Sequence, residues 1–358
     1  MSAEPKTTIL KDVPMMPVDP GRCTLVLALQ TALKFLGQAF DYDYLMGLSG
    51  AGYLFYANPE QPAVIEWCEA MRERWLHIIS DAVGIELRLA EGDRTLFDSD
   101  PEKHFYAQFG KAVTDSLDSR RPCLAYSCFE GPQWDIISGF SGGRLLCRSI
   151  HNPISPSGLI ERIQPYEYNT LWPSRVIVLG QEKTVCPRAD LIRRSIEVCF
   201  EIGRGLTDGE GNRPLTGPSA LGVWADVLQK EHNHKAMKGH QQLRRTLIDS
   251  RISLERFLRW VQAEVGQEFG PDVHFARKHF AKSFEILMSI DISDEAMAQE
   301  ASRLKIADDI RSLEETEARA FGHLERVHEG MKKTGSPDCG LPIADLSAVA
   351  SATAELET

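Results

Sequence analysis

Residues 134–150 read WDIISGFSGGRLLCRSI, two runs of apolar and β-branched residues on either side of a glycine pair. Such runs predict strands, and the connection Ser141-Gly142-Gly143-Arg144 is typical of an antiparallel β-hairpin. Three other segments have the same character, which gives five expected strands: Ile85–Leu89, Cys123–Cys128, Trp134–Phe140, Leu145–Ile150 and Arg175–Leu179. Helical patterns precede most of them. Helices followed by an antiparallel sheet predict an α+β domain.

The helices expected in this first domain are set by apolar periodicity and by end signals. They span approximately Cys23–Leu36, Pro62–Val83 and Asp100–Ser119. The first of them is apolar on nearly every face, which is typical of a helix buried in a core. Asp19 suits the N-cap and Pro20 the first helical position, so Cys23 is expected in the first turn.

Beyond residue 181 the sequence changes character and no strand signal remains. Five segments are amphipathic at helical period: Arg188–Arg204, Ala220–Glu231, Gln241–Val265, Pro271–Ser289 and Asp294–Glu329. The sequence therefore predicts an α+β domain over 1–181 and an all-helical domain over 182–333. The glycine-rich stretch 203–217 is expected to be a loop. The tail 334–358 is small and polar, and we expect it to be disordered.

Composition narrows the class of protein. The chain has 358 residues, 43% of them hydrophobic and 25% charged, with a net charge of −11. The negative charge argues against binding to nucleic acid or to an anionic membrane surface. We expect no membrane segment and no secretory signal. None of the eight cysteines has C-x-x-C spacing, so we expect reduced thiols and a cytoplasmic protein.

Cys23 is the residue that points most directly to chemistry. A thiol in the first turn of a helix is close to the positive end of the helix dipole, and Arg22 adds a cation. Both favour the thiolate, which is the nucleophilic form. The alternative is a cysteine that simply fills an apolar core. The local sequence alone leaves both interpretations open.

A resemblance adds to this pattern. The cysteine that opens an apolar helix and the sequence of residues 47–56, GLSGAGYLFY, resemble the N-terminal domain of the butirosin-biosynthesis protein H family, which is related to papain-like C39 peptidases. The later segments PCLAYSC, WDIISGF and LLCRSIHNP occur in the matching order, and GPSALGVWADVL resembles the start of the helical domain that often follows. The resemblance implies a papain-like α+β fold. It also implies a cysteine that takes an acyl group as a thioester, which an amine or water then resolves. In butirosin assembly the acyl donor is bound to a carrier protein.

The same resemblance implies a set of site residues. Cys23 matches the nucleophile, Gln133 occupies the place of the usual histidine base, and Asn152 corresponds to the orienting acid. A glutamine cannot accept a proton from a thiol near neutral pH, so the base is unidentified. His151 and Asp135 are expected to point away from the site. We expect the substrate to contact residues near the nucleophile and on the central strand: Gly50, Gly52, Tyr53 and Trp134.

Other motifs favour structural roles. The segment 49–52 lacks the third glycine of a dinucleotide-binding loop, and we expect no cofactor. His232, His234 and His240 have poor spacing for a metal site on a helix, and we expect no metal there.

Two functions remain open from the sequence. The first is cysteine-dependent acyl or amide transfer to or from a small molecule or peptide, with an acyl substrate that is free or bound to a carrier protein. The second is a catalytically reduced protein that binds a ligand or partner in the same groove. The oligomeric state is not predicted.

Overall fold

The computed structural model describes residues 7–17, 22–55, 74–92, 94–129, 133–150, 167–204, 216–230 and 237–333. The chain divides into two compact units, each made of two sequence segments. The sheet unit contains Met1–Leu45 and Ile79–Val185, and the helical unit contains Met46–Ile78 and Cys186–Thr358. The fold is α+β, with an N-terminal antiparallel sheet and helices followed by a largely helical region. Among the described helices, none is both long and apolar enough to cross a membrane.

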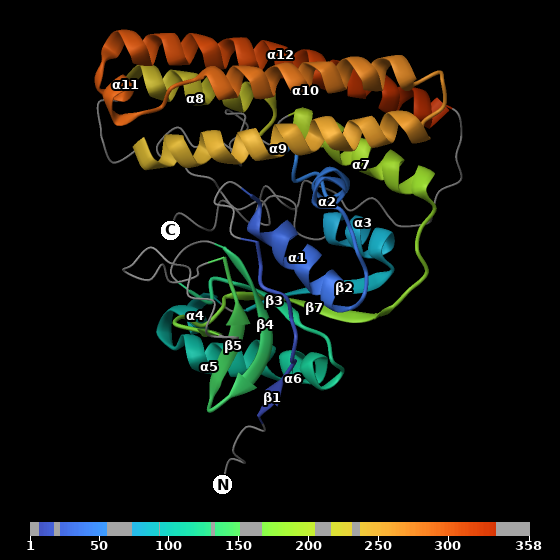
Figure 1. The fold of residues 1–358 in the computed structure, drawn as a ribbon, viewed down its shortest axis with the longest axis vertical. Helices are drawn as coiled ribbons and strands as arrows, with labels where there is room; N and C mark the ends of the chain where they lie inside the picture. Colours follow the sequence, from blue (N-terminus) through green and yellow to red (C-terminus); the bar gives the residue numbers. More distant parts are fainter. Residues whose placement is uncertain are drawn as a thin grey trace. The chain divides into compact units, whose positions relative to one another are not determined.

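The sheet unit is built on one antiparallel sheet (Figure 1). Its strands are β1 (Thr8–Ile9), β2 (Ile85–Glu91), β3 (Cys123–Tyr126), β4 (Trp134–Ser141), β5 (Arg144–Arg148), β6 (Glu167–Tyr168) and β7 (Arg175–Glu182). The order across the sheet is β2-β7-β3-β4-β5-β6, and β1 pairs with the far end of β4. All five predicted strands are present. The two-residue strands β1 and β6 are additional.

The predicted hairpin between β4 and β5 has a clear local cause. Ser141 and Arg144 face each other as the last pair of the ladder, so the turn consists of Gly142 and Gly143. Their backbone φ angles are 58° and 76°, values that residues other than glycine rarely adopt. Two left-handed residues give a turn whose twist matches that of the strands. The glycine pair therefore fixes the register of β4 against β5.

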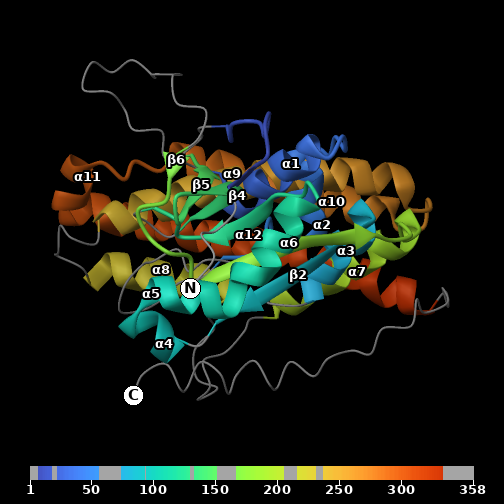
Figure 2. The same ribbon diagram turned by 90° about the horizontal axis from the view of Figure 1, so that it is seen from below.

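Helices cover both sides of this sheet. Helix α1 (Thr24–Phe35) packs against β3 and β4, and α6 (Lys111–Asp118) packs against β1, β3 and β7; Figure 2 shows them on opposite sides of the strands. The predicted helix 100–119 consists of α5 (Pro101–Phe105), one π-helical turn (Tyr106–Gly110) and α6. The side chain of Asp100 accepts a hydrogen bond from the Lys103 N–H and caps the start. The short helix α4 (Arg94–Ser99) was not predicted.

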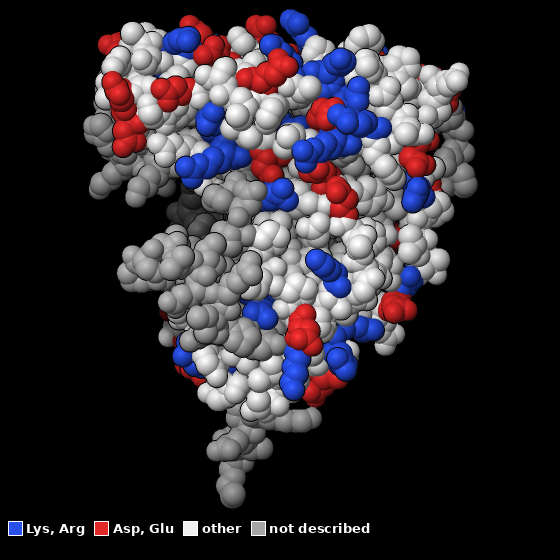
Figure 3. Space-filling model, in the orientation of Figure 1, with Lys and Arg blue, Asp and Glu red and all other residues white. Residues whose placement is uncertain are grey.

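The helical unit is a set of long helices that run side by side (Figure 1). The long helices are α7 (Arg188–Gly203), α8 (Pro218–Lys230), α9 (Met237–Glu264), α10 (Gly270–Ser289) and α12 (Glu300–Lys333), and the short helix α11 (Asp294–Ala298) precedes α12. Apolar faces of α8, α9, α10 and α12 form its core, which includes Trp224 and Leu313. On the face seen in Figure 3, acidic and basic side chains are intermixed over these helices. This pattern is typical of a solvated surface.

The structure differs from the predicted helices in two further places. The segment 294–329 is two helices, because Gln299 has an extended ψ of 123° and interrupts the helical ladder. Helix α2 (Tyr42–Leu48) was not predicted, and α3 (Arg74–Val83) is the described part of the helix expected over 62–83. The tail 334–358 and most of the loop 203–217 lie outside the described residues.

Candidate functional site

Cys23 lies directly before the first residue of α1. It is the N-cap residue, with an extended backbone (φ −64°, ψ 110°), and not a residue of the first turn as the sequence predicted. The predicted cap, Asp19, lies outside the described residues. The thiol is half-buried. Cys23 therefore stands where the positive end of the α1 dipole is strongest.

Tyr42 contacts Cys23 at this helix start. The backbone N–H of Cys23 donates a hydrogen bond to the Tyr42 hydroxyl oxygen, at 2.8 Å. The guanidinium of Arg22 lies over the ring of Tyr42, 4.7 Å from its centroid. A cation over an aromatic face is attractive, so Arg22 and Tyr42 stabilise one another beside the thiol. The sequence contains no motif that identified Tyr42.

A second contact joins the start of α1 to the start of β4. The backbone N–H of Trp134 donates to Thr24 Oγ1, at 2.9 Å, across 110 residues of sequence. Cys23 precedes Thr24 and Gln133 precedes Trp134, so this bond brings two of the predicted site positions to one end of the sheet. We call it the α1–β4 junction.

The side chain of Gln133 is bound elsewhere. It is 5% exposed, and its Nε2 donates to Ser149 Oγ at 3.1 Å and to Asp135 Oδ1 at 3.4 Å. Among the described residues no hydrogen bond joins Gln133 to Cys23. The expectation that Asp135 points away from Gln133 is wrong, because residues two apart on a strand share a face.

Asp135 is the most unusual group near the junction. It is 0% exposed, and its Oδ2 accepts the backbone N–H of Cys128 at 3.0 Å. Burial raises the pKa of the Asp135 carboxyl to about 7, although hydrogen bonds from Ser149 and Cys128 act in the opposite direction. The negative charge of Glu167 raises this pKa further. Asp135 is therefore partly protonated at neutral pH.

Several other thiols in the described residues are poor nucleophiles. Burial raises the pKa of Cys123 to about 12 and moves those of Cys128 and Cys199 well above the ordinary value. A buried thiol that keeps its proton is not nucleophilic, because the thiolate is the reactive form. Cys23 and Cys186 are the half-buried cysteines in the described part of the chain.

The four residues expected to contact substrate fall into two groups. Trp134, in the sheet unit, is 1% exposed and its ring lies 5.6 Å from that of Tyr126. Gly50, Gly52 and Tyr53 belong to the helical unit. Substrate binding by these residues stays a prediction.

The structure explains the two glycines by packing. A Cβ at Gly50 would lie 2.6 Å from the side chain of Val198, and one at Gly52 would lie 2.8 Å from Leu254. Gly50 also has a φ of 78°. These glycines let the segment approach α7 and α9 closely.

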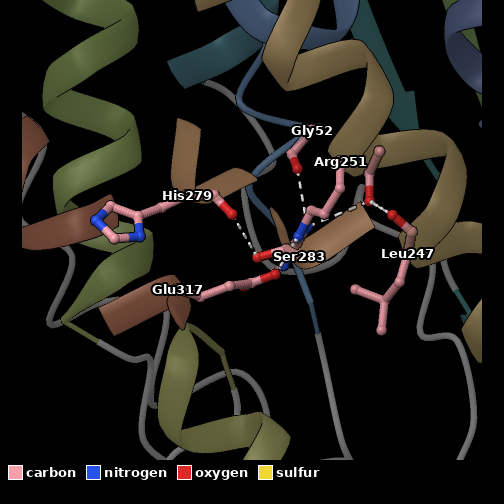
Figure 4. A network of polar contacts seen from close by, with 7 residues as sticks. Gly52, Leu247, Arg251, His279, Ser283 and Glu317 are labelled. Carbon is pink, nitrogen blue, oxygen red and sulfur yellow. Dashed lines mark hydrogen bonds and ion pairs between the residues drawn. The ribbon is translucent and has the colours of Figure 1, made fainter. Parts of the chain in front are cut away.

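A buried ion pair between Arg251 and Glu317 lies against the segment that contains Gly50 and Gly52 (Figure 4). Arg251 on α9 donates to both carboxylate oxygens of Glu317 on α12, each at 2.6 Å, and both side chains are 1% exposed. Its Nη1 also donates to the Gly52 carbonyl oxygen, at 2.9 Å. The guanidinium thus fixes Gly52 in the helical core.

The predicted site residue Asn152 lies outside the described residues, as do His151, which was expected to point away, and His232 and His234, which were not expected to bind a metal. His240 is described, and its Nδ1 accepts a hydrogen bond from Trp224 Nε1 at 2.9 Å in the helical core. No group of three metal-ligating side chains occurs within the part of the chain that is described.

Comparison with models of known protein families finds no match to the chain. Comparison with curated proteins finds no match either.

Proposed function

We propose that the chain performs cysteine-dependent acyl or amide transfer, with Cys23 as the nucleophile in a papain-like sheet unit. The observation that supports this proposal is the α1–β4 junction. A half-buried cysteine at a helix N-terminus stands beside the start of a central strand, held there by the bond from the Trp134 N–H to Thr24 Oγ1. The resemblance of the sequence to the butirosin-biosynthesis protein H family assigns the nucleophile to the same residue.

The chemistry would proceed in two steps. The Cys23 thiolate attacks the acyl carbonyl carbon, a C–S bond forms, and the bond to the leaving group breaks; the leaving group takes a proton from solvent. An amine or water then attacks the thioester, the C–S bond breaks, and the proton of the attacking group passes to solvent. The helix dipole and Arg22 favour the thiolate in the first step.

A second candidate function is the binding of a ligand or partner without catalysis. Two observations favour it. Gln133, at the position of the usual base, is engaged with Asp135 and Ser149. The N–H of Cys23, which in related sites would bind the developing oxyanion, donates to Tyr42.

Alkylation by iodoacetamide at pH 7 tests the proposal. We expect Cys23 to react faster than the other cysteines, as followed by peptide mass spectrometry over time. Cys23→Ser removes the fast site. Cys186→Ser is the matched control, because Cys186 is also half-buried, and it should leave the fast site in place. An inert Cys23 in folded protein would sink the enzyme proposal and leave the binding function.

Acyl transfer itself is tested with small thioesters. Purified protein incubated with a benzoyl thioester should acquire the mass of one benzoyl group on Cys23, and the adduct should disappear when hydroxylamine is added. Cys23→Ser protein should stay unmodified. A fast alkylation rate without any acyl adduct would favour the binding function.

A further inference from the structure

A buried cluster lies next to the α1–β4 junction and has no part in the chemistry above. It consists of Cys128, Gln133, Asp135 and Ser149, and we call it the Asp135 cluster. The carboxyl group at its centre is fully buried and touches hydrogen-bond donors on three sides: a backbone N–H, an amide and a hydroxyl. Within the described part of the chain no cationic side chain is bonded to it. A buried carboxyl without a cation is uncommon.

Burial and a second acid oppose the ionisation of Asp135, although its hydrogen bonds from Ser149 and Cys128 favour it. Glu167 on β6 is a second acid in its field, and the thiol of Cys128, which is hydrogen-bonded to that of Cys147, lies near the carboxyl. Burial keeps the pKa of Cys128 well above its ordinary value, so that thiol remains neutral. Helix α1 has one charged side chain, Lys34, in its last turn, and β3 has none. The two arginines of β5 bond to backbone carbonyls: Arg144 donates to that of Asn169 and Arg148 to that of Val13. The surroundings therefore favour the protonated carboxyl.

The cluster is connected to the site by one residue of backbone. Gln133 uses its amide to bind Asp135 and Ser149, and the next residue, Trp134, uses its backbone N–H to bind Thr24 beside Cys23. The carbonyl of Gln133 also accepts the N–H of Ser127 at 2.8 Å. An opening of the cluster that lets water reach Asp135 must therefore disturb the start of β4.

We propose that Asp135 is a proton-sensitive latch of the α1–β4 junction: it holds the junction closed while it keeps its proton, and each opening that hydrates it releases that proton. Opening then becomes easier as pH rises from acid toward neutral. The inference rests on the proposed function for its link to Cys23, because it makes access to that thiol depend on pH. Asp135 is a positioning residue here, since it acts through Gln133 and Trp134.

The sign of this pH dependence follows from the linkage between opening and the release of the Asp135 proton. The ordinary pKa of aspartate is 3.8, and burial raises that of Asp135 to about 7. Between these values the open form has lost its proton and the closed form has not. The opening constant therefore rises about tenfold per pH unit in this window and levels off above pH 7.

Amide hydrogen exchange measures this opening directly. In the intact protein, the Cys128 N–H, which is bonded to Asp135, should lose protection about 50-fold between pH 5 and 7 after correction for intrinsic exchange. The Trp134 N–H should follow it, and that of Gly84, bonded to Ser80, should not. In Asp135→Asn the dependence should vanish. The matched control Asp98→Asn, an exposed acid of the same unit, should behave as wild type.

A second variant keeps the test clear if Asp135→Asn folds poorly. Ser149→Ala removes a hydrogen-bond donor that favours the carboxylate and so raises the pKa of Asp135 further. The pH at which the opening constant stops rising should therefore increase. Simple loosening of the structure would raise exchange at every pH instead. Protection of Cys128 that does not change with pH in wild type, or that changes equally in Asp135→Asn, would overturn the latch.

The link to Cys23 is tested separately. The ratio of Cys23 alkylation rates in wild type and Asp135→Asn should rise with pH over the same window, because ionisation of the thiol itself is common to both proteins. A constant ratio beside pH-dependent exchange would overturn the link. A Cys23 that never reacts would count against the proposed function, and the exchange result would still decide the latch.

Discussion

Replacement of Glu317 by glutamine tests how the helical unit tolerates a buried cation. Arg251 and Glu317 are each 1% exposed and joined by two contacts of 2.6 Å. The variant keeps one acceptor but removes the negative charge, so the guanidinium stays buried without its counter-ion. Breaking such a pair costs about 3–5 kcal/mol. For a unit of this size, that corresponds to a fall in Tm of roughly 6–20 °C.

Urea unfolding followed by circular dichroism at 222 nm measures the loss. Glu315→Gln is the matched control, because Glu315 is on the same helix, is 75% exposed and contacts Arg319 at 3.9 Å; its loss should stay below about 1 kcal/mol. The double variant Arg251→Met/Glu317→Leu removes both charges and should recover most of the stability. Equal small losses for Glu317→Gln and Glu315→Gln would refute the reasoning. So would a double variant that is less stable than Glu317→Gln.

Three further outcomes are expected. Gly47→Ala should lower the free energy of unfolding by several kcal/mol, as measured by thermal unfolding, since the new Cβ would lie 1.9 Å from the ring of Phe257. Gly322→Ala, with open space around the new Cβ, should raise the free energy of unfolding by up to about 1 kcal/mol. A metal chelator should leave Tm unchanged, because Nδ1 of His240 accepts a hydrogen bond from Trp224 in the core; a fall of several degrees would contradict this. Relative to Asp135→Asn, wild type should lose about 3 kcal/mol of unfolding free energy as pH rises from 4 to 7, because Asp135 keeps its proton in the folded protein and loses it on unfolding; a loss on acidification would contradict the sign.

The sheet could be predicted to the extent that its signals are local. The hairpin of β4 and β5 follows from the pair Gly142-Gly143, and apolar runs of four or more residues mark the other main strands. Strands β1 and β6 have two residues each, too few for a periodic pattern, and they exist because β4 and β5 offer them free edges. The interruption at Gln299 also has no glycine or proline to announce it.

The candidate site could be predicted less well, because its geometry depends on distant contacts. The sequence singled out Cys23, the proposed nucleophile, but the bond between Thr24 and Trp134 spans 110 residues and has no local signal. The cluster around Asp135 could have been found by strict alternation along β4, which puts Gln133 and Asp135 on one face. Ser149, on the neighbouring strand segment, becomes visible only with the register of β5.

The division of the chain has a consequence for its biosynthesis. Residues 46–78 belong to the helical unit although they are flanked in sequence by the sheet unit, and Gly52 reaches its partner Arg251 across 199 residues. At a translation rate of roughly 5–20 residues per second, the ribosome completes that partner about 10–40 s later. During this interval Tyr53 and Phe55, which are buried in the finished protein, have no helices to cover them. The nascent chain therefore passes through a stage in which a chaperone has apolar sequence to bind.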